Sequence, residues 1–131
     1  MKLGIVVADF NEGITSLMLA AAQAEAKRRK AECVIAHVPG AFELPLAVQR
    51  MLSCKEVGAV VALGAIIKGE TSHDEVIAKS VANALMELML RFDTPVTLSI
   101  IGPDVTWDQA TKRAEPYAQH GVEAALAMVK Q

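Results

Sequence analysis

The sequence predicts an α/β fold in which helices cover both faces of a parallel sheet. Four short segments rich in Val, Ile and Leu alternate with four longer segments rich in Ala, Leu, Met, Glu and Lys. The short segments show little polar alternation, which is typical of parallel strands buried on both faces. Because a β-α-β order favours right-handed crossovers, we expect a flavodoxin-like three-layer α/β/α sandwich with a four-stranded parallel sheet in the order 2-1-3-4.

Each element follows from its local composition. The expected strands are apolar runs that cover residues 2–8, 32–38, 57–64 and 95–101. The expected helices are built from residues that lose little side-chain freedom in a helix, and they cover residues 12–30, 43–54, 72–92 and 108–130. With 131 residues, the chain has the size of a single domain spanning residues 1–131, and it needs neither disulfides nor a structural metal to fold.

Composition and charge argue against several classes of function. The net charge of −2 at pH 7 lacks the basic excess of a nucleic-acid or membrane-surface binder, and the basic run at residues 27–30 complements a helix C-terminus. The longest apolar stretch is about half the ~20 residues of a membrane-spanning helix. The first residues do not have the pattern of a secretory signal, and we expect Cys33 and Cys54 each to be a buried thiol in a reducing compartment. These features predict a cytoplasmic protein that binds neither nucleic acid nor membranes.

The expected helix over residues 72–92 has more apolar surface than one sheet face can cover. At 100° per residue its polar arc spans roughly 120° and contains Lys79, Ser80, Asn83, Glu87 and Arg91. The remaining arc contains Ile77, Val81, Leu85, Met86, Leu88, Met89 and Leu90. The excess apolar surface meets either another subunit or a neighbouring helix of the same chain, and a mean hydropathy of +0.33 favours a homo-oligomer.

The functional site is expected beyond the carboxyl ends of the strands, where the strand order reverses. For the order 2-1-3-4 this point lies between the first and third strands. The loops that reach or flank it cover residues 9–11, 39–43, 64–73 and 102–107. Three of the five aromatic residues, Phe10, Phe42 and Trp107, fall in these loops. Rings there indicate either stacking on a planar heterocycle or ordinary anchoring of the loops.

A glycine turn leads into a helix N-terminus within residues 64–73. Its two glycines have the spacing of a phosphate loop, but Glu70 and Thr71 stand where a nucleoside triphosphate site requires Lys-Ser/Thr. We expect Ser72 to cap the helix and Glu75 to complete a capping box. Free backbone N–H groups at such a helix start suit a single phosphate group, although every helix has an N-terminus.

His73 lies in the first turn of this helix. The helix dipole disfavours its imidazolium form, whereas Asp74 and Glu75 favour it, so the ring is a candidate proton shuttle near neutral pH. The alternative is a merely exposed or capping histidine. His37 and His120 have no metal-ligand spacing with it, and the chain has no dinucleotide fingerprint. We therefore predict no metal ion.

Four segments together resemble a known family. They are Phe10-Asn11, the Val-Pro-Gly-Ala-Phe-Glu-Leu-Pro block at residues 38–45, the Gly-Ala-Ile-Ile-Lys-Gly-Glu-Thr-Ser-His block at residues 64–73, and residues 108–114. In this order and spacing they are closely similar to the 6,7-dimethyl-8-ribityllumazine synthases, and most of all to archaeal members. The similarity extends over essentially the whole chain.

The resemblance implies a transferase of riboflavin biosynthesis. Its reaction condenses 5-amino-6-(D-ribitylamino)uracil with 3,4-dihydroxy-2-butanone 4-phosphate to 6,7-dimethyl-8-ribityllumazine, releasing phosphate and water without a cofactor. It also implies a homopentamer or a sixty-subunit shell of pentamers, with active sites shared between adjacent subunits. The alternatives are a non-catalytic lumazine- or flavin-binding or shell protein, and the related archaeal riboflavin synthase.

The resemblance also implies a role for individual residues. His73 is the catalytic residue that relays protons. The implied substrate-binding residues are Phe10, Asn11, Ala41, Phe42, Glu43, Ala65, Ile66, Ile67 and Leu98. The implied phosphate-binding residues are Gly69, Glu70, Thr71 and Arg113, the last serving a neighbour's pocket. Two positions depart from the family: Leu98 stands where most members have Phe, and His120 stands close to the place of a phosphate-side lysine.

Overall fold

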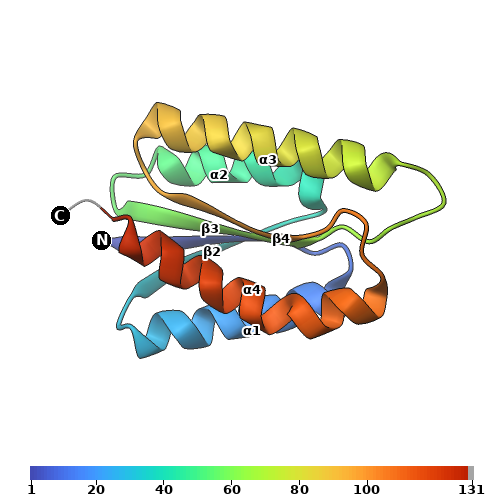
Figure 1. The fold of residues 1–131 in the computed structure, drawn as a ribbon. Helices are drawn as coiled ribbons and strands as arrows, with labels where there is room; N and C mark the ends of the chain where they lie inside the picture. The colour runs from blue at the N-terminus through green and yellow to red at the C-terminus, as the bar shows by residue number, and fades with distance from the viewer. Residues whose placement is uncertain (130–131) are drawn as a thin grey trace.

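The computed structural model describes residues 1–129, which contain a parallel sheet of four strands (Figure 1). In chain order the strands are β1 (Lys2–Ala8), β2 (Glu32–Val38), β3 (Val57–Ala65) and β4 (Val96–Ile101). Their spatial order is β2-β1-β3-β4, and all neighbouring pairs are parallel. The predicted fold class and strand order are therefore confirmed.

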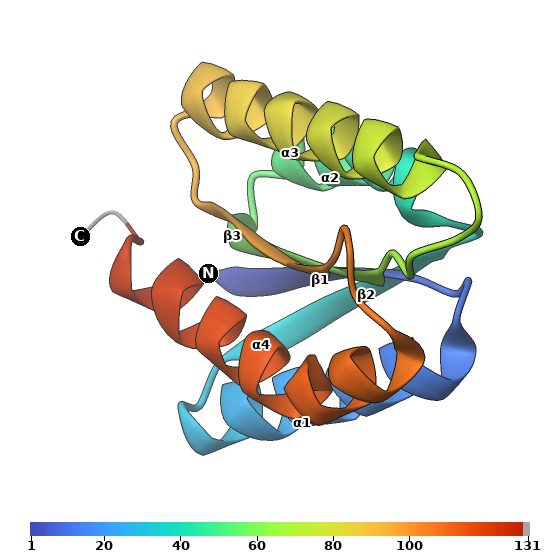
Figure 2. The same cartoon turned by 45° about the vertical axis from the view of Figure 1, so that its right-hand side comes forward.

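Helices cover both faces of this sheet. They are α1 (Glu12–Arg28), α2 (Leu44–Leu52), α3 (His73–Phe92) and α4 (Trp107–Ala127), with a short 3-10 helix η1 (Ala41–Glu43) before α2. α1 and α4 lie on one face, and α2 and α3 lie on the other (Figure 1 and Figure 2). α1 ends before its predicted end because Lys30 adopts a left-handed backbone with φ 60°. The predicted end of the last helix, Lys130, lies outside the described residues.

Among residues 1–129, no helix is both long and apolar enough to cross a membrane.

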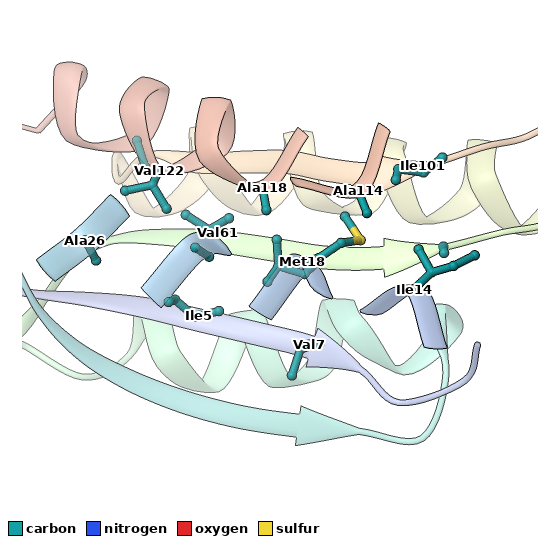
Figure 3. Close-up of a cluster of buried hydrophobic side chains, with 14 of the residues drawn as sticks. Ile5, Val7, Ile14, Met18, Ala26, Val61, Ile101, Ala114, Ala118 and Val122 are labelled. Carbon is teal, nitrogen blue, oxygen red and sulfur yellow. The ribbon is translucent and has the colours of Figure 1, made fainter. Parts of the chain in front are cut away.

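The alternation of side chains along the central strands produces two cores. Ile5 and Val7 of β1 point toward α1 and α4, where Met18, Ala114 and Ala118 belong to the same buried cluster (Figure 3). The opposite sides of β1 and β3 pack on α2 and α3 in a second cluster. Its members include Val6, Val60, Leu44, Val48 and Leu85. The alanines at a spacing of four residues allow α4 to approach the sheet closely.

The expectation that all four strands are buried on both faces is wrong for β2. Val34 and Ile35 of this strand are about one-third exposed, at 37% and 36%. β2 is an edge strand, paired only with β1 among the described residues. Because β2 lies at the edge of the sheet, the helices cover its side chains only in part.

The outer side of α3 keeps the apolar excess that the sequence predicts. Val76, Met86 and Leu90 are 60%, 54% and 71% exposed, respectively, whereas Val81 and Leu85 are buried against the sheet. α2 packs beside α3, yet it leaves these three side chains exposed. The neighbouring helix of the same chain therefore does not account for this surface.

A buried carboxylate joins the end of α1 to α4. Glu25 is 4% exposed and accepts hydrogen bonds from Arg28, Arg29 and Gln119. The basic run at residues 27–30 thus ends the helix as predicted, and two of its members also hold this acid. Hydrogen bonds from Arg28 and then Arg29 lower the pKa of Glu25 to about 2.

We expect Glu25→Gln to weaken folding at neutral pH by an amount that shrinks in acid. The pKa of Glu25 is lower in the folded chain than its ordinary value of 4.5. The ionised carboxylate therefore contributes to the free energy of unfolding above pH 4.5, and this contribution is lost as the pH falls toward about 2. Urea unfolding of both proteins at equal concentration, from pH 7 downward, measures the difference. A constant difference across this range would contradict the assignment.

Candidate active site

A cleft of about 470 Å³ opens beyond the carboxyl ends of β1 and β3. This is the point at which the strand order reverses, on the side of the molecule opposite the two chain ends in Figure 1. Most of the residues named from the sequence line it. They are Phe10, Asn11, Ala41, Phe42, Glu43, Ala65, Ile66, Ile67, Gly69, Thr71 and His73.

Asn11 holds the turn after β1 against the end of β3. Its backbone is left-handed, with φ 63° and ψ 47°, a conformation that Asn tolerates better than most residues. Its side-chain Nδ2 donates a hydrogen bond to the carbonyl oxygen of Ala65 at 2.8 Å. The adjacent N–H of Phe10 donates to the carbonyl of Pro39 at 2.9 Å. These bonds fix the backbone beneath the Phe10 ring, which is 70% exposed.

Phe42 provides a second exposed ring at the same cleft. It lies in η1, whose backbone closes with a hydrogen bond from the Glu43 N–H to the carbonyl of Gly40 at 3.2 Å. Phe42 is 65% exposed, so neither it nor Phe10 anchors its loop in the core. Trp107 differs, because its ring lies against α1. A Cβ added at Gly13 of this helix would be 3.0 Å from the Trp107 ring. The loop-anchoring interpretation therefore fits Trp107 alone.

His37 and Asp9 form a polar pair beside this part of the cleft. The ring Nδ1 of His37 lies 2.8 Å from Oδ1 of Asp9, and both side chains are about half exposed, at 54% and 55%. They join the carboxyl ends of β1 and β2 immediately before Phe10. Nothing in the sequence near His37 indicates this contact, since only the parallel pairing of β1 and β2 brings His37 to Asp9.

The predicted capping box at Ser72 and Glu75 is wrong. Ser72 is the N-cap residue of α3, but its φ of −85° and ψ of 19° differ from the extended backbone that lets a side chain reach the first turn. The N–H of His73 instead lies 3.5 Å from the Thr71 hydroxyl. A complete capping box occurs on α4, where Thr106 has the extended backbone.

The first turn of α3 combines an exposed histidine with a buried acid. His73 is exposed and lines the cleft, as does its neighbour Asp74, which is only 7% exposed. Oδ2 of Asp74 accepts a hydrogen bond from the backbone N–H of Asp104 at 3.0 Å. From the sequence, Asp74 is only a charge near His73, because nothing local to α3 indicates that its side chain is buried.

Three of the residues named from the sequence lie outside the lining of this cleft. Glu70 is an exposed residue of the turn before α3. Leu98 is 52% exposed and lines a second hollow of about 550 Å³ between β4 and α4, together with Tyr117 and His120. Arg113 is exposed one helical turn before Tyr117. The structure thus separates Leu98 and Arg113 from His73 within one chain.

The described part of the chain, residues 1–129, holds no group of three or more His, Cys, Asp or Glu side chains placed to bind a metal ion. The residues that line the cleft offer aromatic faces, backbone hydrogen-bonding groups and the imidazole of His73.

Comparison with known proteins decides the family. The family model described as 6,7-dimethyl-8-ribityllumazine synthase matches residues 1–131. The chain belongs to the lumazine synthase family. A protein of that name from Metallosphaera sedula is 52% identical over 99% of this chain and 87% of its own length. Its counterpart from Saccharolobus islandicus is 49% identical over 99% and 85%, and that from Sulfolobus acidocaldarius is 44% identical over 99% and 83%.

We expect two substitutions of Asn11 to separate the stability that its hydrogen bond to Ala65 contributes from the cost of its left-handed backbone. Asn11→Gly keeps the left-handed backbone but loses the bond to Ala65, which should cost about 1 kcal/mol. Asn11→Ala also forces an unassisted Cβ into that conformation and should cost a further ~1–2 kcal/mol. Urea unfolding measures both. Equal losses for the two variants would show that the backbone conformation carries no cost.

Proposed function

We propose that this lumazine synthase condenses 5-amino-6-(D-ribitylamino)uracil with 3,4-dihydroxy-2-butanone 4-phosphate in riboflavin biosynthesis, without a cofactor. The observation that carries the proposal is the joint presence of His73, two exposed aromatic rings and the glycine turn in one cleft. The names of the relatives support this condensing enzyme over a riboflavin synthase or a non-catalytic binding protein.

The pyrimidine substrate is proposed to bind on the β1 side of the cleft. Phe10 would stack on its ring, since an exposed aromatic face held by a fixed backbone loses little entropy on stacking. Backbone groups of residues 65–67 would meet the polar edge of the ring. Phe42 and Glu43 would contact the ribityl chain, with the carboxylate of Glu43 accepting hydrogen bonds from its hydroxyl groups.

The phosphorylated ketone is proposed to bind at the start of α3. Gly69 has open space where a Cβ would lie, so an anion can approach the backbone of the turn closely. Thr71 lines the same part of the cleft and offers a hydroxyl donor, and Glu70 contributes its backbone. The positive end of the α3 dipole favours the dianion there.

His73 would relay the protons that the condensation moves. The 5-amino group adds to the ketone carbonyl and water leaves to give an imine. A proton then leaves the adjacent carbon as the C–O bond to phosphate breaks, and the resulting enol tautomerises to a ketone. The ribityl-bearing nitrogen adds to this ketone and closes the ring with loss of a second water. Each step transfers a proton between groups within reach of an imidazole that can both accept and donate one.

A neighbouring subunit is proposed to complete each site. Arg113 would supply a bidentate cation for the phosphate that the backbone amides alone lack, and Leu98 would form an aliphatic wall beside the substrate ring. Both lie on the β4 and α4 side of the chain, away from its own cleft. The exposed apolar side chains of α3 support the same assembly, a homopentamer either alone or within a sixty-subunit shell.

We place the enzyme in the cytoplasm. Cys33 and Cys54 are free thiols, a state that persists in a reducing compartment. The expectation that both thiols are buried is wrong, because Cys33 is partly exposed and Cys54 is exposed. Substrates and product are then small polar molecules of the same compartment, and the single domain of residues 1–131 acts as one subunit of the oligomer.

We expect His73→Ala to lower the rate of lumazine formation by roughly ten- to a thousandfold, while the substrates still bind. The wild-type protein mixed with both substrates should release inorganic phosphate and produce lumazine absorbance. A mixture without protein measures the uncatalysed rate, and circular dichroism shows that the variant is folded. A folded His73→Ala protein that turns over at the wild-type rate would remove His73 from the mechanism.

A further inference from the structure

Asp74 is a buried acid in a place where burial is not required. An acid in the first turn of a helix complements the dipole while fully exposed, yet Asp74 is 7% exposed and its neighbours His73 and Glu75 are exposed. Burying a carboxylate is unfavourable unless it gains a hydrogen-bond partner. That partner is the backbone N–H of Asp104, 3.0 Å away and thirty residues further along the chain.

The loop that contains Asp104 also holds the other end of the glycine turn. The N–H of Lys68 donates to the carbonyl of Val105 at 2.9 Å, and Nζ of Lys68 lies 3.1 Å from the carboxylate of Asp104. The hydrogen bond to Asp104 raises the pKa of Lys68, so the lysine stays charged. Gly102 allows the close crossing, because a Cβ there would lie 2.1 Å from the carbonyl oxygen of Ile66.

These contacts bracket the segment that is proposed to bind phosphate. Lys68 precedes it and Asp74 follows it, whereas inside the segment the Ser72 side chain makes no capping bond and Gly69 has open space around its Cβ position. The contacts of Lys68 and Asp74, at the two ends of the turn, therefore hold it in place. Successive residues of a helix point about 100° apart, so fixing Asp74 inward also fixes the direction in which His73 points.

We propose that Asp74 is a positioning residue, whose hydrogen bond to the Asp104 backbone aims His73 and the turn at residues 69–71 toward one phosphate-bearing substrate. This proposal rests on the proposed function. It assigns to Asp74 a role in turnover that acts through His73 and the turn, separate from a contribution to folding.

The test compares Asp74→Ala, Asp74→Asn and the control Glu87→Ala. Asp74→Ala removes the acceptor and should lower kcat about ten- to hundredfold and raise KM for the phosphorylated ketone, because small misplacements of a reacting group have effects of this size. Asp74→Asn keeps an oxygen that can accept the Asp104 N–H and should restore kcat to within about threefold. Glu87→Ala removes an acid and its ion pair with Arg91 from the same helix and should turn over like the wild type.

A second readout follows the binding of inorganic phosphate itself. Backbone amide resonances of residues 69–73 should shift on titration with phosphate in the wild type and in Asp74→Asn, and about tenfold more phosphate should be needed in Asp74→Ala. If Asp74→Ala fails to fold, Lys68→Met takes its place in the test. This variant loses the exposed ion pair with Asp104, and it should likewise need more phosphate than the wild type.

Three outcomes would overturn the positioning role. They are a folded Asp74→Ala with wild-type kcat and phosphate affinity, an Asp74→Asn as impaired as Asp74→Ala, and, where Asp74→Ala is unfolded, a Lys68→Met with unchanged phosphate binding. An inactive wild-type protein would instead reject the proposed function, so the two failures are distinguishable.

Discussion

The parallel strand order β2-β1-β3-β4 is the constraint on which the rest of the structure depends. Because all strands run the same way, the chain leaves β1 toward one face of the sheet and leaves β3 toward the other, and the two loops diverge above neighbouring strands. The hydrogen bond from Asn11 to the Ala65 carbonyl closes the floor of the gap that results. The aromatic rings and the start of α3 then form its walls.

The same order explains why one chain does not form the whole proposed site. β4 is the strand farthest along the sheet from β1 on the β3 side, so Leu98 and the α4 residue Arg113 lie away from the cleft. The apolar side chains left exposed on α3, together with Leu98 and Tyr117, are the surfaces on which a second copy can pack. These exposed surfaces support the proposal of a site divided between subunits.

The sequence predicts the elements of the fold well and their long-range contacts poorly. Apolar runs and helix-forming segments identify the four strands and the four α-helices of residues 1–129 but not η1, and the strand order then locates the cleft. The Ser72 capping box fails because the backbone of Ser72 is not extended, which the local spacing of residues does not reveal. The burial of Asp74 depends on the same distant loop, and the exposure of β2 depends on its edge position.

The division of the site between subunits is the central claim, and mixed oligomers test it most directly. His73→Ala and Arg113→Ala would be refolded together, and phosphate release would be measured at a low concentration of the phosphorylated ketone. If each site takes His73 from one subunit and Arg113 from the next, about a quarter of the sites in a random mixture are intact, and activity should rise well above that of either variant alone. Activity equal to the average of the two separate variants would contradict a shared site.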